Sequence, residues 1–138
     1  MAHNAESSDN RVMRIYLDIC CLKRPFDDQT QPRVHLESEA VLAILDAPAN
    51  QVQLLHLRAH DLENEQNSSP QRAASVRQWL QARPRMELSD ATLVARTSEL
   101  MALGFKNFDA FHVASAEAAA ADVFITCDDR LLATARRH

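Results

Sequence analysis

The sequence has little of what marks secreted or membrane proteins. It contains three cysteines among 138 residues, without a CxxC pair, and two of them, Cys20 and Cys21, are adjacent. Such spacing suits neither a disulfide framework nor a zinc knuckle, so we expect reduced, packed cysteines without a metal role in a cytoplasmic protein. No apolar run approaches the roughly 20 residues of a transmembrane helix. The pattern therefore predicts neither a disulfide-rich fold nor a membrane span.

The sequence also lacks an overall positive charge. The formal net charge is -4 at pH 7, which argues against a protein that coats nucleic acid by bulk electrostatics. Positive charge is nevertheless concentrated between residues 67 and 88, where four arginines accompany a single acid. These arginines are Arg72, Arg77, Arg83 and Arg85. The segment is either a local contact site for an anionic partner or a solvated helix face.

Length and composition predict one compact domain. The apolar and charged fractions, 46% and 25%, are ordinary for a globular protein. Residues 1–12 are polar and lack the basic start and apolar centre of a secretory signal, so we expect a flexible N-terminal arm there. Residues 13–138 then form the single domain.

Strand and helix patterns alternate along this domain. Segments rich in β-forming and apolar residues predict strands at residues 13–17, 51–57 and 122–126. Helical spacing of apolar residues predicts helices that begin at or just after Pro32, Arg58, Pro70, Ser89, Asn107 and Asp128. The only glycine, Gly104, lies where a helix is expected to end. Alternation of this kind implies right-handed crossovers and a mostly parallel sheet covered on both faces, an α/β fold.

Acidic residues follow the predicted strands. Asp18 comes directly after the first strand and Asp128 just after the last. Both should therefore lie at the carboxyl edge of the sheet, where open parallel sheets place their functional crevice. Asp109 falls in the first turn of a helix, and Glu63 follows the second strand. Acids that converged there would repel one another unless a cation lay between them, and Mg²⁺ and Mn²⁺ prefer oxygen ligands.

Each acid also has a structural interpretation. Asp109 is favoured in a first helical turn by the helix dipole, and Asp128 is a suitable N-cap. Glu63 lies on a polar segment where solvated acids are ordinary, and Asp18 would be satisfied by an arginine. His112, three residues after Asp109, would either orient that acid or be a core histidine.

Four stretches carry a resemblance to a known family: "IYLDICC" with "RPFDD", "DLENEQN" and "FDAFHVASAEAAAADVFITCDD". In this order they resemble the successive motifs of the PIN-domain ribonucleases, the fold of the VapC-type toxins of toxin/antitoxin pairs. The resemblance implies a three-layer α/β/α domain and a divalent-metal-dependent endoribonuclease that uses Mg²⁺ or Mn²⁺ to hydrolyse RNA. It also implies an antitoxin protein as partner and a homodimer. Lys23, Arg24 or the arginines of residues 67–88 would hold the RNA strand.

Position by position, the resemblance assigns metal binding and catalysis to Asp18, Glu63, Asp109 and Asp128. Glu65 competes with Glu63 because "ENEQN" allows a slip of two residues, and Asp129 competes with Asp128. Many members of the family have a small polar residue after the first acid, where this chain has Ile19.

A second interpretation belongs to a different functional class. Fold and function separate easily, so the chain could keep the PIN fold and act as a non-catalytic protein-interaction module. An intact set of four acids argues against this alternative. A thermal stabilisation by Mn²⁺ that disappears when the acids are replaced would favour the enzyme.

Overall fold

The computed structural model describes residues 11–138. In this range the chain forms three strands, β1 (Met13–Leu17), β2 (Val52–Leu54) and β3 (Val123–Ile125). The predicted N-terminal arm, residues 1–12, lies almost wholly outside the described residues. Of its last two residues, Arg11 forms an ion pair with Asp122 at 2.6 Å.

The three strands form one parallel sheet in the order β2-β1-β3. β1 has the predicted bounds, and its last three residues are buried because it is the central strand. β2 is shorter than the predicted strand at residues 51–57. Leu55 N still donates to Ile15 O of β1 at 3.0 Å. The chain then turns away from β1, since the His56 carbonyl accepts from Met86 N at 2.8 Å and Leu57 forms a single bridge with Met86.

Seven α-helices and one 3-10 helix surround the sheet within residues 11–138. They are α2 (Ile19–Lys23), η1 (Arg24–Phe26), α3 (Pro32–Leu45), α4 (Arg58–Asn64), α5 (Pro70–Gln81), α6 (Asp90–Ala102), α7 (Asn107–Ala118) and α8 (Asp129–Arg137). Ser89 is the N-cap of α6, as predicted, whereas Lys106 rather than Asn107 is the N-cap of α7. Gly104 has a φ of +112° just after α6, a backbone conformation that favours glycine.

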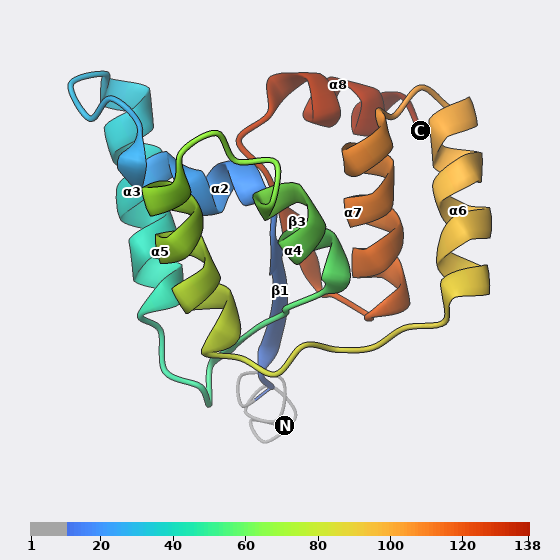
Figure 1. The fold of residues 1–138 in the computed structure, drawn as a ribbon, viewed down its shortest axis with the longest axis horizontal. Coiled ribbons are helices and arrows are strands. Elements are labelled where there is room, and N and C mark those ends of the chain that lie inside the picture. Colours follow the sequence, from blue (N-terminus) through green and yellow to red (C-terminus); the bar gives the residue numbers. More distant parts are fainter. Residues whose placement is uncertain (1–10) are drawn as a thin grey trace, which may run out of the picture.

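Helices cover both faces of the sheet. Figure 1 shows α3 and α5 on one side of β1 and α7 and α6 on the other. Side chains alternate along β1: Ile15 and Leu17 pack with Val41 of α3 and Val76 of α5, whereas Tyr16 packs with Ala116 of α7. The predicted three-layer α/β/α fold is therefore confirmed.

The carboxyl ends of the strands share one edge because all three strands run in the same direction. Asp18 N donates to Ile125 O at 2.9 Å, which extends the pairing of β1 with β3 by one step. The end of β1 is thereby fixed beside the segment that follows β3. None of the helices within residues 11–138 has the length and apolar character needed to cross a bilayer.

Candidate functional site

Asp18 lies where β1 ends and α2 begins, and it is 4% exposed. Its Oδ1 atom accepts from Ile19 N at 2.8 Å, which is the N-cap bond of α2. Its Oδ2 atom accepts from Thr126 Oγ1 at 2.8 Å and from Cys20 Sγ at 3.4 Å. The carboxylate is therefore buried and held in one orientation by groups from two strand ends.

No arginine compensates Asp18 in the described part of the chain. Arg24 instead contacts Asp27 at 3.2 Å and Glu37 at 3.3 Å, so the ion pair that the sequence left open is not formed. The nearest ionisable nitrogen is His112 Nε2, 3.7 Å from Asp18 Oδ1. Asp18 is thus a buried acid without a guanidinium partner.

The pKa of Asp18 reflects this setting. Burial is the largest cause that raises it, and the charges of Cys20 and Glu63 add to the effect. His112 and the hydrogen bond from Thr126 oppose it, and the resulting pKa is raised from 3.8 to about 7. The ionised form of Asp18 is therefore disfavoured in the fold because no positive charge compensates it. A bound cation would supply that charge and stabilise the ionised carboxylate.

His112 links Glu63 to the same place. The ring is fully buried on α7, and its Nε2 atom lies 2.6 Å from Glu63 Oε1 on α4. Its Nδ1 atom contacts the hydroxyl of Tyr16. Burial is the largest cause that raises the pKa of Tyr16 well above 10.0, so the phenol keeps its proton, and its contact with Nδ1 fixes the orientation of the ring. Asp18, Glu63 and His112 each offer a ligand atom, and these atoms all lie within 4.8 Å of one another.

His112 is fully buried, as its interpretation as a core histidine predicts, but it contacts Glu63 rather than orienting Asp109. The spacing of three residues placed His112 and Asp109 on one helix, which is correct. The contact with Glu63 spans 49 positions, and no sequence pattern signals it. His112 is thus both a core residue and a contact of the site, and its position three residues after Asp109 is the one sequence signal that could have found it.

Asp109 lies in the first turn of α7 and is partly buried. Burial is the largest cause that raises its pKa to about 6, followed by the charges of Asp18, Asp128 and Glu63. These four acids therefore lie in one electrostatic neighbourhood, although Asp109 and Asp128 are outside the closest group of ligand atoms. We refer to Asp18, Glu63, Asp109 and Asp128 as the carboxylate cluster.

Asp128 is the N-cap of α8, as its structural interpretation predicts. Its Oδ1 atom accepts from Arg130 N at 2.9 Å and from Leu131 N at 3.4 Å. Asp128 N itself donates to Thr126 Oγ1 at 3.0 Å. The cap fixes the direction of the side chain and occupies only one of its oxygens.

The two competing acids lie in different surroundings. Asp129 is exposed, and Arg33 bonds to both of its carboxylate oxygens at 2.8 and 2.9 Å. These bonds lower the pKa of Asp129 below its ordinary value. Glu65 is the exposed C-cap residue of α4. The geometry therefore favours Glu63 over Glu65 and Asp128 over Asp129.

Most arginines of residues 67–88 make contacts within the fold. Arg83 donates to two backbone carbonyls, at 2.6 and 3.4 Å. Arg85 forms ion pairs with Asp61 and Glu87, and Arg72 forms one with Asp27. These three arginines have structural partners, which weakens the interpretation of the segment as a contact site for RNA.

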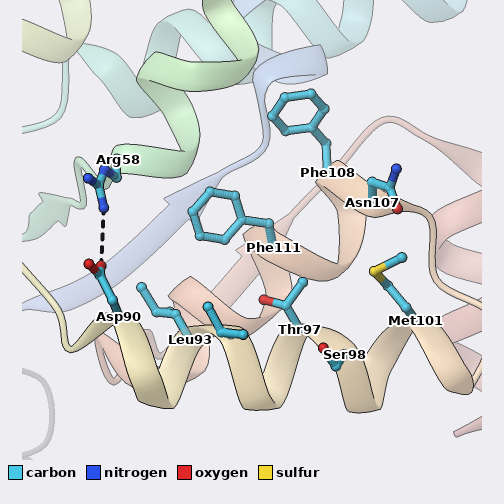
Figure 2. Close-up of a pocket in the computed structure, with 10 residues that line it drawn as sticks. Arg58, Asp90, Leu93, Thr97, Ser98, Met101, Asn107, Phe108 and Phe111 are labelled. Carbon is cyan, nitrogen blue, oxygen red and sulfur yellow. Dashed lines mark hydrogen bonds and ion pairs between the residues drawn. The ribbon is translucent and has the colours of Figure 1, made fainter.

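A cavity of about 500 Å³ lies apart from the carboxylate cluster, between α6 and α7. Figure 2 shows its apolar wall of Leu93, Phe108 and Phe111 and the ion pair of Arg58 with Asp90, whose atoms lie 3.1 Å apart. No member of the cluster lines this cavity. The one acid among its lining residues, Asp90, is paired with Arg58, so the cavity offers no group of unpaired carboxylates for a cation.

The donor set of the carboxylate cluster fits a divalent cation such as Mg²⁺ or Mn²⁺. Its ligand atoms are carboxylate oxygens, which hard cations prefer. Two of its members, Asp18 and Asp109, have pKa values raised first by burial and then by neighbouring negative charges, and a bound cation would relieve both effects. An acidic site with these properties is a candidate metal centre.

Comparison with protein families points the same way. Searches of curated proteins and of solved structures give no match. The PIN domain family matches residues 15–137, nearly the whole chain, and PIN domains are generally metal-dependent nucleases, so the match suggests a nuclease. This chain therefore belongs to the PIN domain family.

Proposed function

We propose that the protein is a divalent-metal-dependent endoribonuclease that hydrolyses RNA phosphodiester bonds. The observation that carries this proposal is the carboxylate cluster at the carboxyl edge of a parallel sheet. Within residues 11–138 none of its four members forms an ion pair with an arginine or lysine, and Asp18 is 4% exposed. Membership of the PIN domain family supports a nuclease rather than another metal-dependent enzyme.

Asp18, Glu63 and Asp109 would hold Mg²⁺ or Mn²⁺, directly or through water, and Asp128 would complete the set. When bound there, such an ion neutralises charge on the phosphodiester and lowers the pKa of a coordinated water. The same residues are the proposed catalytic residues, because they would act on the reacting atoms through the ligands that they provide.

The chain keeps these carboxylates in place before any substrate arrives. Thr126 and the first N–H of α2 hold Asp18, and His112 holds Oε1 of Glu63. Glu63 Oε2 has no hydrogen-bond partner among the described residues, so it stays available as a ligand. Fixed ligands of this kind reduce the reorganisation that metal and substrate binding require.

Lys23 is the basic side chain that we assign to the RNA backbone. It is the last residue of α2, the short helix that Asp18 caps. Within residues 11–138 it forms no ion pair, whereas Arg24 beside it is paired with Asp27 and Glu37. A lysine free of acidic partners can contact a phosphate next to the cluster.

The biological role that we propose is that of a VapC-type toxin, inhibited by an antitoxin protein and acting in the cytoplasm as a homodimer. The four motifs support this role by resemblance. Exposed apolar side chains on α6, Val94 at 66% and Met101 at 44%, offer a surface for a protein partner. Light scattering on the purified chain tests the dimer.

The proposal is tested by incubating the purified full chain with RNA and Mn²⁺, with and without a chelator. We expect cleavage that requires the metal and that Asp18→Asn reduces roughly 10³-fold. A chain that binds Mn²⁺ and cleaves no RNA would favour the non-catalytic interaction module. Equal cleavage by wild type and Asp18→Asn would show that the activity arises elsewhere.

A further inference from the structure

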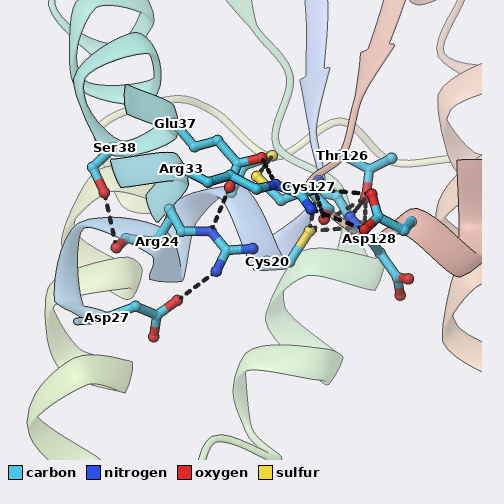
Figure 3. A network of polar contacts seen from close by, with 12 residues as sticks. Cys20, Arg24, Asp27, Arg33, Glu37, Ser38, Thr126, Cys127 and Asp128 are labelled. Carbon is cyan, nitrogen blue, oxygen red and sulfur yellow. Dashed lines mark hydrogen bonds and ion pairs between the residues drawn. The ribbon is translucent and has the colours of Figure 1, made fainter. Parts of the chain in front are cut away.

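The three cysteines of the chain, which the sequence predicts to be packed, meet at one place in the fold. Cys20 and Cys21 lie on α2, and Cys127 follows β3, 106 positions after Cys21. Their sulfur atoms all lie within 4.8 Å of one another, and Cys21 Sγ and Cys127 Sγ are 3.5 Å apart. Figure 3 shows Cys20 and Cys127 close to Thr126.

The backbone holds the three sulfur atoms in this arrangement. Leu17 pairs with Ile125 in the parallel sheet, so α2 begins where β3 ends. Cys21 Sγ donates to Ile125 O at 3.4 Å, and Cys127 N donates to Cys20 Sγ at 3.2 Å. The grouping therefore follows from the strand register, and the sulfurs are fixed before any ligand binds.

Their separations fit a thiolate metal site. In a tetrahedral Zn²⁺ site with Zn–S bonds of about 2.3 Å, neighbouring sulfurs lie about 3.8 Å apart. The separations in the fold span this value, from 3.5 Å to at most 4.8 Å. Cys21 is buried, whereas Cys20 and Cys127 are only partly buried, so an ion can enter from their side and take water as its fourth ligand.

Ligand type and charge select the cation. Sulfur ligands favour soft or borderline ions such as Zn²⁺ over Mg²⁺. Three thiolates carry three negative charges. With a divalent cation bound, the site has a net charge of about -1, and with a monovalent cation it has a net charge of about -2. Because Cys20 Sγ lies 3.4 Å from Asp18 Oδ2, the smaller residual charge is favoured.

We propose that Cys20, Cys21 and Cys127 bind one Zn²⁺ ion, at a site that lies beside the carboxylate cluster and uses none of its four acids as ligands. Titration of Cd²⁺, a spectroscopic substitute for Zn²⁺, into the reduced, metal-free full chain tests this site. One equivalent of Cd²⁺ should produce a sulfur-to-metal charge-transfer absorption in the ultraviolet and release protons from the thiols. Zn²⁺ should displace the signal, and Mg²⁺ at the same concentration should not.

Serine variants and a matched control locate the site. Cys20→Ser and Cys127→Ser should each weaken binding by at least the roughly 10–100-fold that loss of an outer-shell partner costs. Asp109→Asn should leave the absorption unchanged, because it alters only the carboxylate cluster. Wild type that absorbs no more than Cys127→Ser on titration would overturn the proposal.

X-ray absorption spectroscopy of the Zn²⁺-loaded wild type needs no variant. It therefore tests the proposal even if the serine variants fail to fold. Three sulfur ligands would support the site, and fewer would overturn it. Neither readout involves RNA cleavage, so this site and the proposed nuclease activity stand or fall separately.

Discussion

Asp128 and Asp129 are adjacent in the sequence and lie in opposite electrostatic settings. Asp129 faces solvent, where Arg33 bonds to both of its oxygens and lowers its pKa. Asp128 belongs to the carboxylate cluster, where its charge helps to raise the pKa of another member, Asp109, to about 6. Within residues 11–138 the fold thus separates acids that are paired with arginine on the surface from acids without such a partner at the edge of the sheet.

This difference shows which acids stabilise the fold and which do not. Asp122, like Asp129, has a lowered pKa, because it accepts a backbone hydrogen bond from Arg14 and pairs with Arg11. Asp18, in contrast, has a pKa raised to about 7 chiefly by burial. An acid whose ionised form is disfavoured in the fold is a cost to stability, and a bound cation would offset it. The unpaired acids are therefore best explained by function.

The largest effect is expected when the deepest acid of the cluster is neutralised. Asp18→Asn should reduce RNA cleavage roughly 10³-fold, since loss of metal-based charge stabilisation costs several kcal/mol in the transition state. Initial rates at saturating Mn²⁺ measure this loss. Asp129→Asn, which removes a surface ion pair, should leave the rate within about twofold. Equal losses in the two variants would erase the distinction between the two kinds of acid.

The next comparison is between two glutamates, Glu63 in α4 and Glu65 at the C-cap of that helix. Glu63→Gln should reduce cleavage roughly 100-fold, because it removes a charged ligand while retaining the size of the side chain and an oxygen for the His112 bond. Glu65→Gln should cleave like wild type, because Glu65 is exposed outside the cluster. Rates of the two variants under identical conditions provide the measurement, and a reversed order would assign the ligand to Glu65.

Metal binding should also appear in stability, without any substrate. Mn²⁺ at 100 times its dissociation constant should stabilise the wild type by about 2.7 kcal/mol, which is roughly 8 °C in Tm for a domain of this size. Thermal unfolding monitored by circular dichroism measures the shift. Asp129→Asn should keep it and Asp18→Asn should lose it. A shift that survives in Asp18→Asn would place the bound ion elsewhere.

The smallest effect is a gain in stability from removing a repelled acid. Since the pKa of Asp109 in the fold is about 6, above its ordinary 3.8, its contribution to stability falls as pH rises from about 4 to about 6. Metal-free Asp109→Asn should therefore equal wild type in free energy of unfolding near pH 4. At pH 8 it should exceed wild type by about 1 kcal/mol, a value reduced from the full shift because the group is half exposed.

Urea unfolding of the two proteins across this pH range, with a chelator present, gives the difference directly. Titrating groups that are not coupled to Asp109, such as His60, whose pKa burial lowers to about 3, affect both proteins equally and cancel. A variant less stable than wild type at pH 8 would mean that Asp109 is a stabilising first-turn acid of α7.

The sequence predicted the parts of this structure that depend on local patterns. β1 has the predicted bounds because its apolar run is buried on both faces, and the prolines and Ser89 mark helix starts. The end of β2 at Leu54 was not predictable, because it depends on the bridge between Leu57 and Met86, which lies far along the chain and draws the backbone away from β1.

The side-chain contacts of the site were less predictable. The acids could be assigned to one edge of the sheet from their places after strands, but the contact of His112 with Glu63 depends on how α7 packs against α4. The meeting of Cys127 with Cys20 and Cys21 depends likewise on strand register. Arginines such as Arg83 could not be divided into structural and RNA-binding groups without the positions of their acceptors.

The central claim is that the carboxylate cluster binds one or more divalent cations, and anomalous X-ray scattering from a crystal of the full chain soaked in Mn²⁺ tests it most directly. We expect an anomalous peak coordinated by Asp18 and Glu63, with Asp109 bound directly or through water. A crystal with no peak there at saturating Mn²⁺, or with Mn²⁺ bound only at paired surface acids such as Asp27, would contradict the claim.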